Sequence, residues 1–396
     1  MSELQQPITE RGLLALFRTH TERLQRRLAE AGVDVMVVTS VDSIYYLTGY
    51  WGDLGMEFGR PTIVVVPKDG APTLITALME MPMCRAMTWV EDLRGYTDGD
   101  GGEWREPLAA VLGSSPGARI GLEWFDLPAV IADFLRAGPH AARLSDATEV
   151  IARLRMIKGP EEIAMIRQAG RVAIAMGAAG KAAIGEGVPE YEVSLACIAA
   201  GTRKAAEIIA AEDLGALMSP MIHNLQVLQS GHFTSYTHLH PRVRTIERGD
   251  PVYMCFCPIA HFKQFKLGYD REYFVGEVTD ETASTYQVCV AAQQAAIAAM
   301  RPGVIAQDVN AAAVEVYRAG GFEPSYRTGR ALGYSSLEQP ELKQGDTTPL
   351  EAGMLFAVDG GITVPGVFGA RVGDTVLVTE TGTEVITESP RDLEVL

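Results

Sequence analysis

The segment that decides the fold runs from Ser230 to Phe274 and reads SGHFTSYTHLHPRVRTIERGDPVYMCFCPIAHFKQFKLGYDREYF. It opens with a Ser-Gly pair, and His238 follows seven residues after that pair. A Gly-Asp pair at 249–250 precedes an apolar run that contains Cys255, and Asp270 opens the next apolar run. Short apolar runs bounded by loop residues predict neighbouring strands. The segment therefore predicts a sheet that carries a few isolated polar residues.

Composition narrows the class of protein. A chain of 396 residues is long enough for two domains with their own cores, and 47% hydrophobic with 21% charged residues is typical of a soluble globular protein. The net charge of -16 argues against a nucleic-acid partner, because phosphate binding needs a basic surface. The first residues lack a basic stretch followed by a long apolar core, so we expect no secretory signal, and no apolar stretch approaches the ~20 residues that span a bilayer. Five cysteines without a C-x-x-C pair suit a reducing, cytoplasmic location.

The pattern along the chain predicts two domains. An amphipathic helix over residues 11–33 precedes apolar strands at 33–39 and 62–67, and helices and strands alternate to about residue 155, which favours an α/β domain. Gly159-Pro160 marks the boundary, since proline suits the first turn of a helix. Beyond it we expect helices packed on a curved, mostly antiparallel sheet, with helices to about 182 and at 189–211 and 281–300, and strands at 251–257, 271–278, 354–359 and 374–379.

These features resemble the pita-bread family of aminopeptidase P, prolidase, methionine aminopeptidase and creatinase. The resemblance rests on the Ser230–Phe274 segment, on KGPEEI at 158–163, on GEGVPEYEV at 185–193 and on LEAGM at 350–354, and it covers nearly the whole chain. It implies an N-terminal creatinase-like α/β domain over 1–155. A C-terminal α+β pita-bread domain, a curved antiparallel sheet covered by helices, would follow over 156–396.

In the metallopeptidases of this family, two Asp, one His and two Glu hold two divalent ions. By resemblance, these positions fall here on the following residues: Cys255, Tyr269 with Asp270 beside it, Arg330, Asp359 and Gly373. A guanidinium has no lone pair to give a metal and repels a cation. The sequence therefore argues against a dinuclear metal site, and we expect neither a metal nor another cofactor.

Loss of the ligands with retention of the histidine resembles the creatinase branch. Phe58-Gly-Arg60 is similar to the substrate-contacting motif of creatinase, Asp270-Arg271 resembles its Glu-Arg pair, and Asp359 stands in the place of its second catalytic Glu. Both glutamates are aspartates here, and the histidine of the Gly-His motif is Arg330. The loop between 258 and 270 also looks longer. These departures indicate a creatinase-like scaffold with a different substrate.

Three residues are candidates for catalysis. His238 can take a proton from water and return it to a leaving nitrogen near neutral pH. Asp270 and Asp359 lie on different predicted strands and could converge on one pocket, where carboxylates hold a cationic amidine or orient water. The alternatives are a histidine satisfied within its loop, and a surface ion pair between Asp270 and Arg271.

Candidates for substrate binding are Phe58, Arg60, Arg271, Arg330 and Arg371. The planar fork of arginine suits recognition of a carboxylate. The alternative for each arginine is solvation, or an ion pair with one of the 50 acids. In creatinase-like enzymes an N-domain arginine enters the pocket of the partner subunit. The resemblance therefore implies a homodimer in which Arg60 reaches the partner's site.

A pocket with carboxylates at one end, arginines at the other and His238 between them fits a small zwitterionic substrate. The leading hypothesis is a metal-independent hydrolase that cuts a C–N bond in a compact amidine, guanidino compound or cyclic amino-acid derivative, creatine-like or ectoine-like. Three alternatives stay open: a metal-dependent Xaa-Pro peptidase, a lyase that uses the same histidine as a base, and a non-catalytic binding protein on this scaffold.

Overall fold

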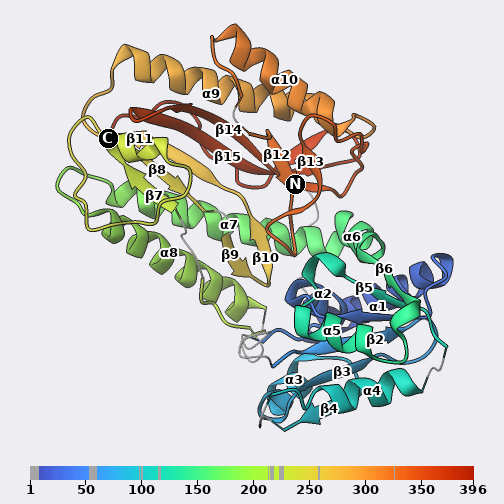
Figure 1. The fold of residues 1–396 in the computed structure, drawn as a ribbon. Helices are drawn as coiled ribbons and strands as arrows, with labels where there is room; N and C mark the ends of the chain where they lie inside the picture. The colour runs from blue at the N-terminus through green and yellow to red at the C-terminus, as the bar shows by residue number, and fades with distance from the viewer. Residues whose placement is uncertain are drawn as a thin grey trace. The chain divides into compact units, whose positions relative to one another are not determined.

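The computed structural model in Figure 1 divides into two compact units, Met1–Arg155 and Met156–Leu396. It describes residues 9–396 except 53–59, 98, 100, 115–116, 213, 215–217, 223–226, 257–258 and 325, and it leaves the side chains of 259–261 undescribed. None of the helices in the described ranges is both long enough and apolar enough to cross a membrane.

The first unit is a six-stranded sheet with helices. Its strand order is β4-β3-β2-β1-β5-β6, in which β1 pairs parallel with β5 and antiparallel with β2. Thr9 caps α1 by accepting the N–H of Gly12, and a buried stripe that includes Phe17 and Leu24 packs this helix inward. The elements are α1 (Glu10–Glu30), β1 (Val35–Val38), α2 (Val41–Thr48), β2 (Ile63–Pro67), β3 (Thr73–Ala77), α3 (Met81–Met87), β4 (Asp92–Tyr96), α4 (Arg105–Gly113), β5 (Ile120–Leu122), α5 (Ala129–Ala137), β6 (Leu144–Asp146) and α6 (Thr148–Met156).

The second unit is built on a larger, mostly antiparallel sheet, with strand order β13-β12-β14-β15-β11-β8-β7 and β16 paired to β15. Its first helix begins as the sequence predicts: Pro160 occupies the first turn, and Glu162 accepts the N–H of Gly159 at 2.6 Å. The elements are α7 (Pro160–Ala183), α8 (Glu190–Ala211), β7 (Val227–Ser230), β8 (Pro251–Cys255), the hairpin β9 (Ile259–Phe262) and β10 (Phe265–Leu267), β11 (Asp270–Phe274), α9 (Asp280–Ala299), α10 (Ala306–Ala319), β12 (Gly329–Ala331), β13 (Glu338–Leu342), β14 (Leu355–Val364), β15 (Phe368–Val378) and β16 (Thr383–Val385).

All four long helices of this unit pack on one face of the large sheet. Helix α9 runs along β14 and β15, and α10 packs against α9 and β13 (Figure 1). Helix α8 contacts β7, and α7 packs against α8 and the β9–β10 hairpin. Val372 and Val376 of β15 belong to the core that α9 and α10 cover. Gly177 of α7 lies so close to Tyr269 that an added Cβ would meet its ring at 2.5 Å. Because side chains alternate along a strand, the residues next to these point to the other face. The predicted fold class is confirmed.

Strands β11 and β15 meet through one backbone register pair, Asp270 with Gly373. On either side of that pair, side chains form hydrogen bonds in place of the backbone hydrogen bonds that regular strand pairing would supply. Thr375 Oγ1 donates to the carbonyl of Gly268 and accepts its N–H, both at 2.9 Å. On the other side, Glu272 Oε2 accepts the N–H of Arg371 at 2.9 Å. We call this junction between β11 and β15 the seam.

Candidate active site

The face of the large sheet opposite the helices carries a row of residues from four strands. Cys255 of β8 pairs with Asp270 of β11, Asp270 pairs with Gly373 of β15, and Gly373 pairs with Asp359 of β14. Directly paired residues project to the same face. The ligand position assigned by resemblance to Tyr269 is therefore occupied by Asp270, which corrects the prediction. Tyr269 itself points to the helix side.

Gly373 leaves a gap between the two carboxylates of this row. A Cβ added to Gly373 would lie 2.9 Å from Asp270 Oδ2 and 2.9 Å from Asp359 Oδ1. The two acids therefore reach toward one small volume from the two sides of β15. The prediction that Asp270 and Asp359 converge agrees with this geometry.

Arg330 of β12 orients Asp359. Its Nη1 lies 3.3 Å from Asp359 Oδ2, and its Nε donates to the carbonyl of Ser336 at 2.8 Å. The second carboxylate oxygen, Asp359 Oδ1, is buried and has no hydrogen-bond partner in the described part of the chain. Burial raises the pKa of Asp359 above its usual value, while the charges of Arg330 and Arg327 oppose that rise. Arg330 therefore stands beside one of the carboxylates, rather than at the far end of the pocket as predicted.

Asp270 has a phenol as its neighbour. Tyr253 of β8 donates from its hydroxyl to Asp270 Oδ2 at 3.1 Å, and both residues are buried. Burial and the nearby Asp270 raise the pKa of Tyr253 well above its usual value, so this hydroxyl keeps its proton and remains a donor. The same oxygen that faces the gap at Gly373 is thus fixed by Tyr253.

Arg271 has a structural role, which corrects the prediction that it faces the substrate. It follows Asp270 on β11 and therefore projects to the helix side. Its guanidinium is 1% exposed and bonds Asp374 Oδ1 at 2.9 Å and the carbonyl of Gly373 at 2.9 Å. Asp374 also binds Arg391 at 2.7 Å. The alternative of a surface pair between Asp270 and Arg271 is wrong as well, since the partner of Arg271 is the buried Asp374.

Arg371 lies on the candidate-site face, two residues before Gly373, but its guanidinium is held by its own hairpin. Its Nη1 donates to the carbonyls of Ile362 and Ala370, at 2.5 and 2.8 Å, and its Nη2 donates to Thr363 at 2.7 Å. With 3% of the residue exposed, these contacts fix the β14–β15 hairpin. They give no geometric support to direct substrate binding by Arg371.

His238 lies outside this row, in an exposed turn after the short helix Gly231–Ser235. That turn returns along the edge strand β7: the N–H of Leu228 donates to the carbonyl of Leu239 at 3.2 Å, and Gln229 Nε2 donates to the carbonyl of Tyr236 at 3.0 Å. Gln229 pairs with Tyr253, the neighbour of Asp270. The structure therefore brings the loop to the edge of the site but shows no contact from His238 to the two aspartates.

The motif that frames His238 has a structural explanation. Ser230 donates from its N–H and its hydroxyl to Glu190 Oε1, at 2.9 and 2.6 Å. Arg244 bonds Ser230 Oγ and Asp250 Oδ2, each at 2.6 Å, which joins the Ser-Gly pair to the Gly-Asp pair. Gly231 adopts φ +65°, and an added Cβ would meet Asp250 at 2.8 Å. The spacing of the Ser-Gly and Gly-Asp pairs thus builds the base of the loop.

The remaining predicted residues belong to the other unit or lie outside the described residues. Phe58 falls in the undescribed range 53–59. Arg60 is described and half-buried in the first unit, whereas the row of acids is in the second. Its substrate role stays a prediction.

One buried acid on this face was missed from the sequence. Glu272 is two residues after Asp270 and so shares its face, and burial raises its pKa to about 8. It is 1% exposed, and Oε2 accepts the N–H of Arg371. Alternation along the strand could have identified Glu272, because it is two residues after Asp270. Tyr253 of β8 pairs with Glu272 and therefore lies on the same face.

Comparison with known proteins decides the family. Residues 164–380 match metallopeptidase family M24, and residues 20–157 match the creatinase/prolidase N-terminal domain. The chain belongs to family M24. The predicted membership of the pita-bread family is confirmed.

The proteins that this M24 chain resembles are named for different activities. It is 31% identical over 403 residues to the agropine synthesis cyclase of Rhizobium rhizogenes, covering 96% of each chain. It is 29% identical over 386 residues to the creatinase of a Bacillus strain, covering 93% of this chain and 89% of the relative. The crystal structure of dipeptidase PepE from Mycobacterium ulcerans superposes with a TM-score of 0.79 at 28% identity, covering 96% and 98%. Enzymes that include hydrolases therefore share this scaffold.

The residues present do not fit the two-metal site that the M24 name implies. Of the five positions in question, Asp270 and Asp359 are carboxylates, Cys255 is a thiol, Gly373 offers no side chain and Arg330 offers a cation. Asp359 is already paired with that cation. Within the described ranges, no group of three or more His, Cys, Asp or Glu side chains is arranged to hold a metal ion.

Proposed function

We propose that this protein is a metal-independent hydrolase that cuts a C–N bond in a small polar substrate, in which the reacting nitrogen or its amidine group binds between Asp270 and Asp359. The substrate class is that of compact amidines, guanidino compounds and cyclic amino-acid derivatives. The observation that carries the proposal is the gap over Gly373, toward which both carboxylates point at 2.9 Å from the Cβ position.

The unpartnered oxygen of Asp359 supports an N–H donor in that gap. A buried carboxylate oxygen without a hydrogen bond costs free energy, which a ligand can recover. Arg330 holds Oδ2, so Oδ1 remains turned to the gap. Charge-assisted hydrogen bonds from an amidinium or ammonium group would satisfy Asp359 and Asp270 together. Arg330 is in this view a positioning residue that sets the direction of Asp359.

The position of Arg330 beside Asp359 also supports a reaction that uses no metal ion. A divalent ion at Asp359 would lie next to a guanidinium, and the repulsion between the two cations is strong where water is excluded. The Arg330–Asp359 pair is 13% and 12% exposed, so solvent screens that repulsion only weakly.

In this proposal His238 transfers the proton between water and the leaving nitrogen. Support comes from its position in the loop that borders Tyr253 and from its solvent-exposed ring, which makes no hydrogen bond to the described residues. Water attacks the carbon of the C–N bond, its proton passes to the imidazole, and the nitrogen leaves with a proton. The two aspartates hold the nitrogen side during this step.

The test is a turnover screen of the chelator-treated protein. The protein is dialysed against EDTA, its metal content is measured by ICP-MS, and it is assayed with creatine, ectoine, guanidino acids, cyclic ureas and proline dipeptides. The proposal expects turnover of an amidine or cyclic compound with far less than one metal per chain, and a marked decrease of that turnover in Asp359→Asn. Near-stoichiometric Mn or Zn, with proline-dipeptide cleavage that EDTA abolishes, would replace it by the Xaa-Pro peptidase.

A second candidate is ring closure on the same site. It is favoured by the match to a protein named agropine synthesis cyclase, at 31% identity across 96% of both chains. The chemistry differs in one reactant: a nucleophile within the substrate takes the place of water, and a nitrogen or oxygen leaving group departs. The same carboxylates and the same histidine would serve both reactions.

The isotope content of the product separates the candidates. In H₂¹⁸O, hydrolysis places one solvent oxygen in the product, whereas ring closure places none and yields a cyclic product. A lyase product is recognised by a new double bond. A protein that binds these compounds in a thermal-shift assay, but turns none over, would be the non-catalytic binding protein.

We also propose a homodimer in which Arg60 acts in the site of the partner subunit. Subunit complementation tests this idea. Arg60→Ala and Asp359→Asn are each expected to lower the activity, and a refolded mixture is expected to exceed both, because a heterodimer contains one site with both residues intact. A mixture as inactive as its components, or a monomer by light scattering, contradicts the shared site. Wild-type protein taken through the same refolding is the control.

A further inference from the structure

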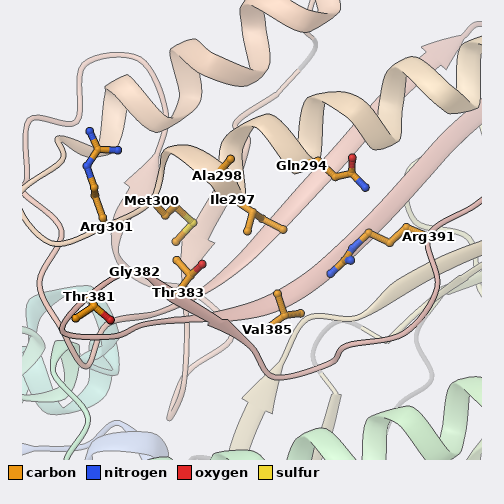
Figure 2. Close-up of a pocket in the computed structure, with 10 residues that line it drawn as sticks. All are labelled: Gln294, Ile297, Ala298, Met300, Arg301, Thr381, Gly382, Thr383, Val385 and Arg391. Carbon is orange, nitrogen blue, oxygen red and sulfur yellow. The ribbon is translucent and has the colours of Figure 1, made fainter.

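A pocket lies on the helix side of the large sheet, away from the row of acids. Its volume is about 370 Å³, and it is formed by the C-terminal half of α9, strand β16 and the segment after it. Figure 2 shows Arg391 and Gln294 at one end, Ile297 and Val385 in the middle, and Arg301 at the opposite end. The guanidinium of Arg301 points away from Arg391 in this view, so Arg391 alone supplies a charge to its end.

The charges around Arg391 leave one positive charge uncompensated. Asp374 accepts from Arg391 Nε at 2.7 Å and from Arg271 Nη2 at 2.9 Å, so two guanidiniums share one carboxylate. The side chains are 18%, 1% and 0% exposed for Arg391, Arg271 and Asp374. Two cations and one anion in a buried cluster favour a further anion next to it.

The guanidinium of Arg391 also has hydrogen-bond donors that no described residue accepts. Asp374 engages only its Nε, and neither terminal nitrogen makes a hydrogen bond within the described residues; Nη2 is buried as well. Asp374 cannot turn toward them, because Gln293 and Thr387 hold its oxygens at 2.9 and 3.0 Å. In a chain with 50 acidic and 34 basic residues, the described residues that line this pocket include no Asp or Glu.

We propose that this pocket binds the carboxylate of a small organic acid with a short apolar body. The planar fork of Arg391 matches a carboxylate, and one negative charge balances the single excess positive charge. A phosphate dianion would exceed that charge. The apolar body lies against Ile297, Met300 and Val385, and the amide of Gln294 at the same end of the pocket as Arg391 donates to the second oxygen.

The experiment measures binding of pentanoate to the full-length protein by isothermal titration calorimetry, without reference to turnover. Pentanoate is expected to bind, while butylammonium, pentanol and inorganic phosphate bind at least about tenfold more weakly, since a charged hydrogen bond is lost or mismatched. Absence of pentanoate binding, or equal binding of pentanol or phosphate, overturns the proposal.

Two variants and one control locate the site. Arg391→Gln removes the charge but keeps a donor for Asp374. Gln294→Glu, on an exposed position of α9, places a carboxylate at the same end of the pocket with little risk to the fold. Both are expected to weaken pentanoate binding by about tenfold or more. Arg301→Gln is the matched control and is expected to retain most of the binding. Unchanged binding in Gln294→Glu would place the ligand elsewhere, even if Arg391→Gln were unstable.

Discussion

Arg330 Nη1 contacts Oδ2 of Asp359 at 3.3 Å, while the other oxygen of that carboxylate is buried without a partner among the described residues. An ion pair that uses one oxygen fixes the direction of the other. In this protein the free oxygen faces the gap over Gly373 and the carboxylate of Asp270. Arg330, at a position that the resemblance assigns to a metal ligand, therefore orients an acid toward this gap.

Neutralising Asp359 tests that arrangement. Asp359→Asn keeps the shape but removes a charge-assisted hydrogen bond, so we expect kcat/KM to fall by about tenfold to a hundredfold. The measurement is steady-state kinetics on the substrate found in the screen. Glu315→Gln, an exposed acid on α10, is the control and should leave kcat/KM unchanged. An unchanged kcat/KM in Asp359→Asn would remove Asp359 from the site.

Filling the gap tests the substrate position separately. Gly373 has an ordinary backbone conformation, so Gly373→Ala adds no backbone strain, but its methyl group would press on Asp270 and Asp359 at 2.9 Å. We expect KM to rise at least tenfold while the melting temperature changes little. Gly185→Ala, whose Cβ would find its nearest neighbour at 3.7 Å, is the control. A KM that stays constant in Gly373→Ala would show that no ligand group enters the gap.

Removing the imidazole tests the proton-transfer step. His238→Asn is expected to lower kcat by about 10² to 10⁴, the usual contribution of a general acid–base. Because His238 is exposed, the variant should match the wild type in circular dichroism and melting temperature. His232→Asn, another exposed histidine of the same loop region, serves as the control. Full activity in His238→Asn would direct attention to Asp270 or Asp359 as the base.

The buried Glu272 predicts how stability depends on pH. Its pKa is about 8 in the folded chain against 4.5 for the free group, so between these values the folded state holds a proton that the unfolded state has released. The free energy of unfolding must therefore decrease as pH rises from about 4.5 to 8. Glu272→Gln removes this contribution and can still accept the N–H of Arg371.

Denaturant unfolding at pH 5 and pH 8 measures that effect. The stability of Glu272→Gln relative to wild type should grow from pH 5 to pH 8, by about 1.4 kcal/mol for each pH unit spanned, as an upper bound. Glu123 in the other unit, whose pKa burial raises to about 7, adds a slope of the same sign. Its contribution is common to both proteins and cancels in the difference. A difference that does not vary with pH would mean that Glu272 is ionised in the folded chain.

Much of the fold could be predicted because its signals are local. Apolar periodicity, Gly159-Pro160 and the Ser-Gly and Gly-Asp pairs each act within a few residues, and the helices begin and end close to the predicted positions. Which residues form the candidate site depends instead on the register in which the strands pair. The β9–β10 hairpin separates β8 from β11 in the sequence, so only the pairing of strands shows that Asp270 rather than Tyr269 faces Cys255.

The predicted arginines show what a sequence cannot supply. Alternation along a strand already places Asp270 and Arg271 on opposite faces, so the two cannot both contact one substrate. Arg371 lies on the same face as the row of acids, but its partners include carbonyls of its own hairpin. Such partners come from chain folding and leave no motif. Asp374, by contrast, is buried between Arg271 and Arg391 and forms an ion pair with each.

The seam has a consequence for how the site is assembled. Asp270 comes from the part of the sheet that α7 and α8 cover, and Asp359 from the part that α9 and α10 cover, so neither half contains the site by itself. One backbone pair and a few side chains, Thr375, Glu272 and Arg271 among them, join the halves. The distance between the two carboxylates therefore reports on docking of the halves. Amide hydrogen exchange at the seam should be faster than within β14, and it should slow when a ligand bridges the acids.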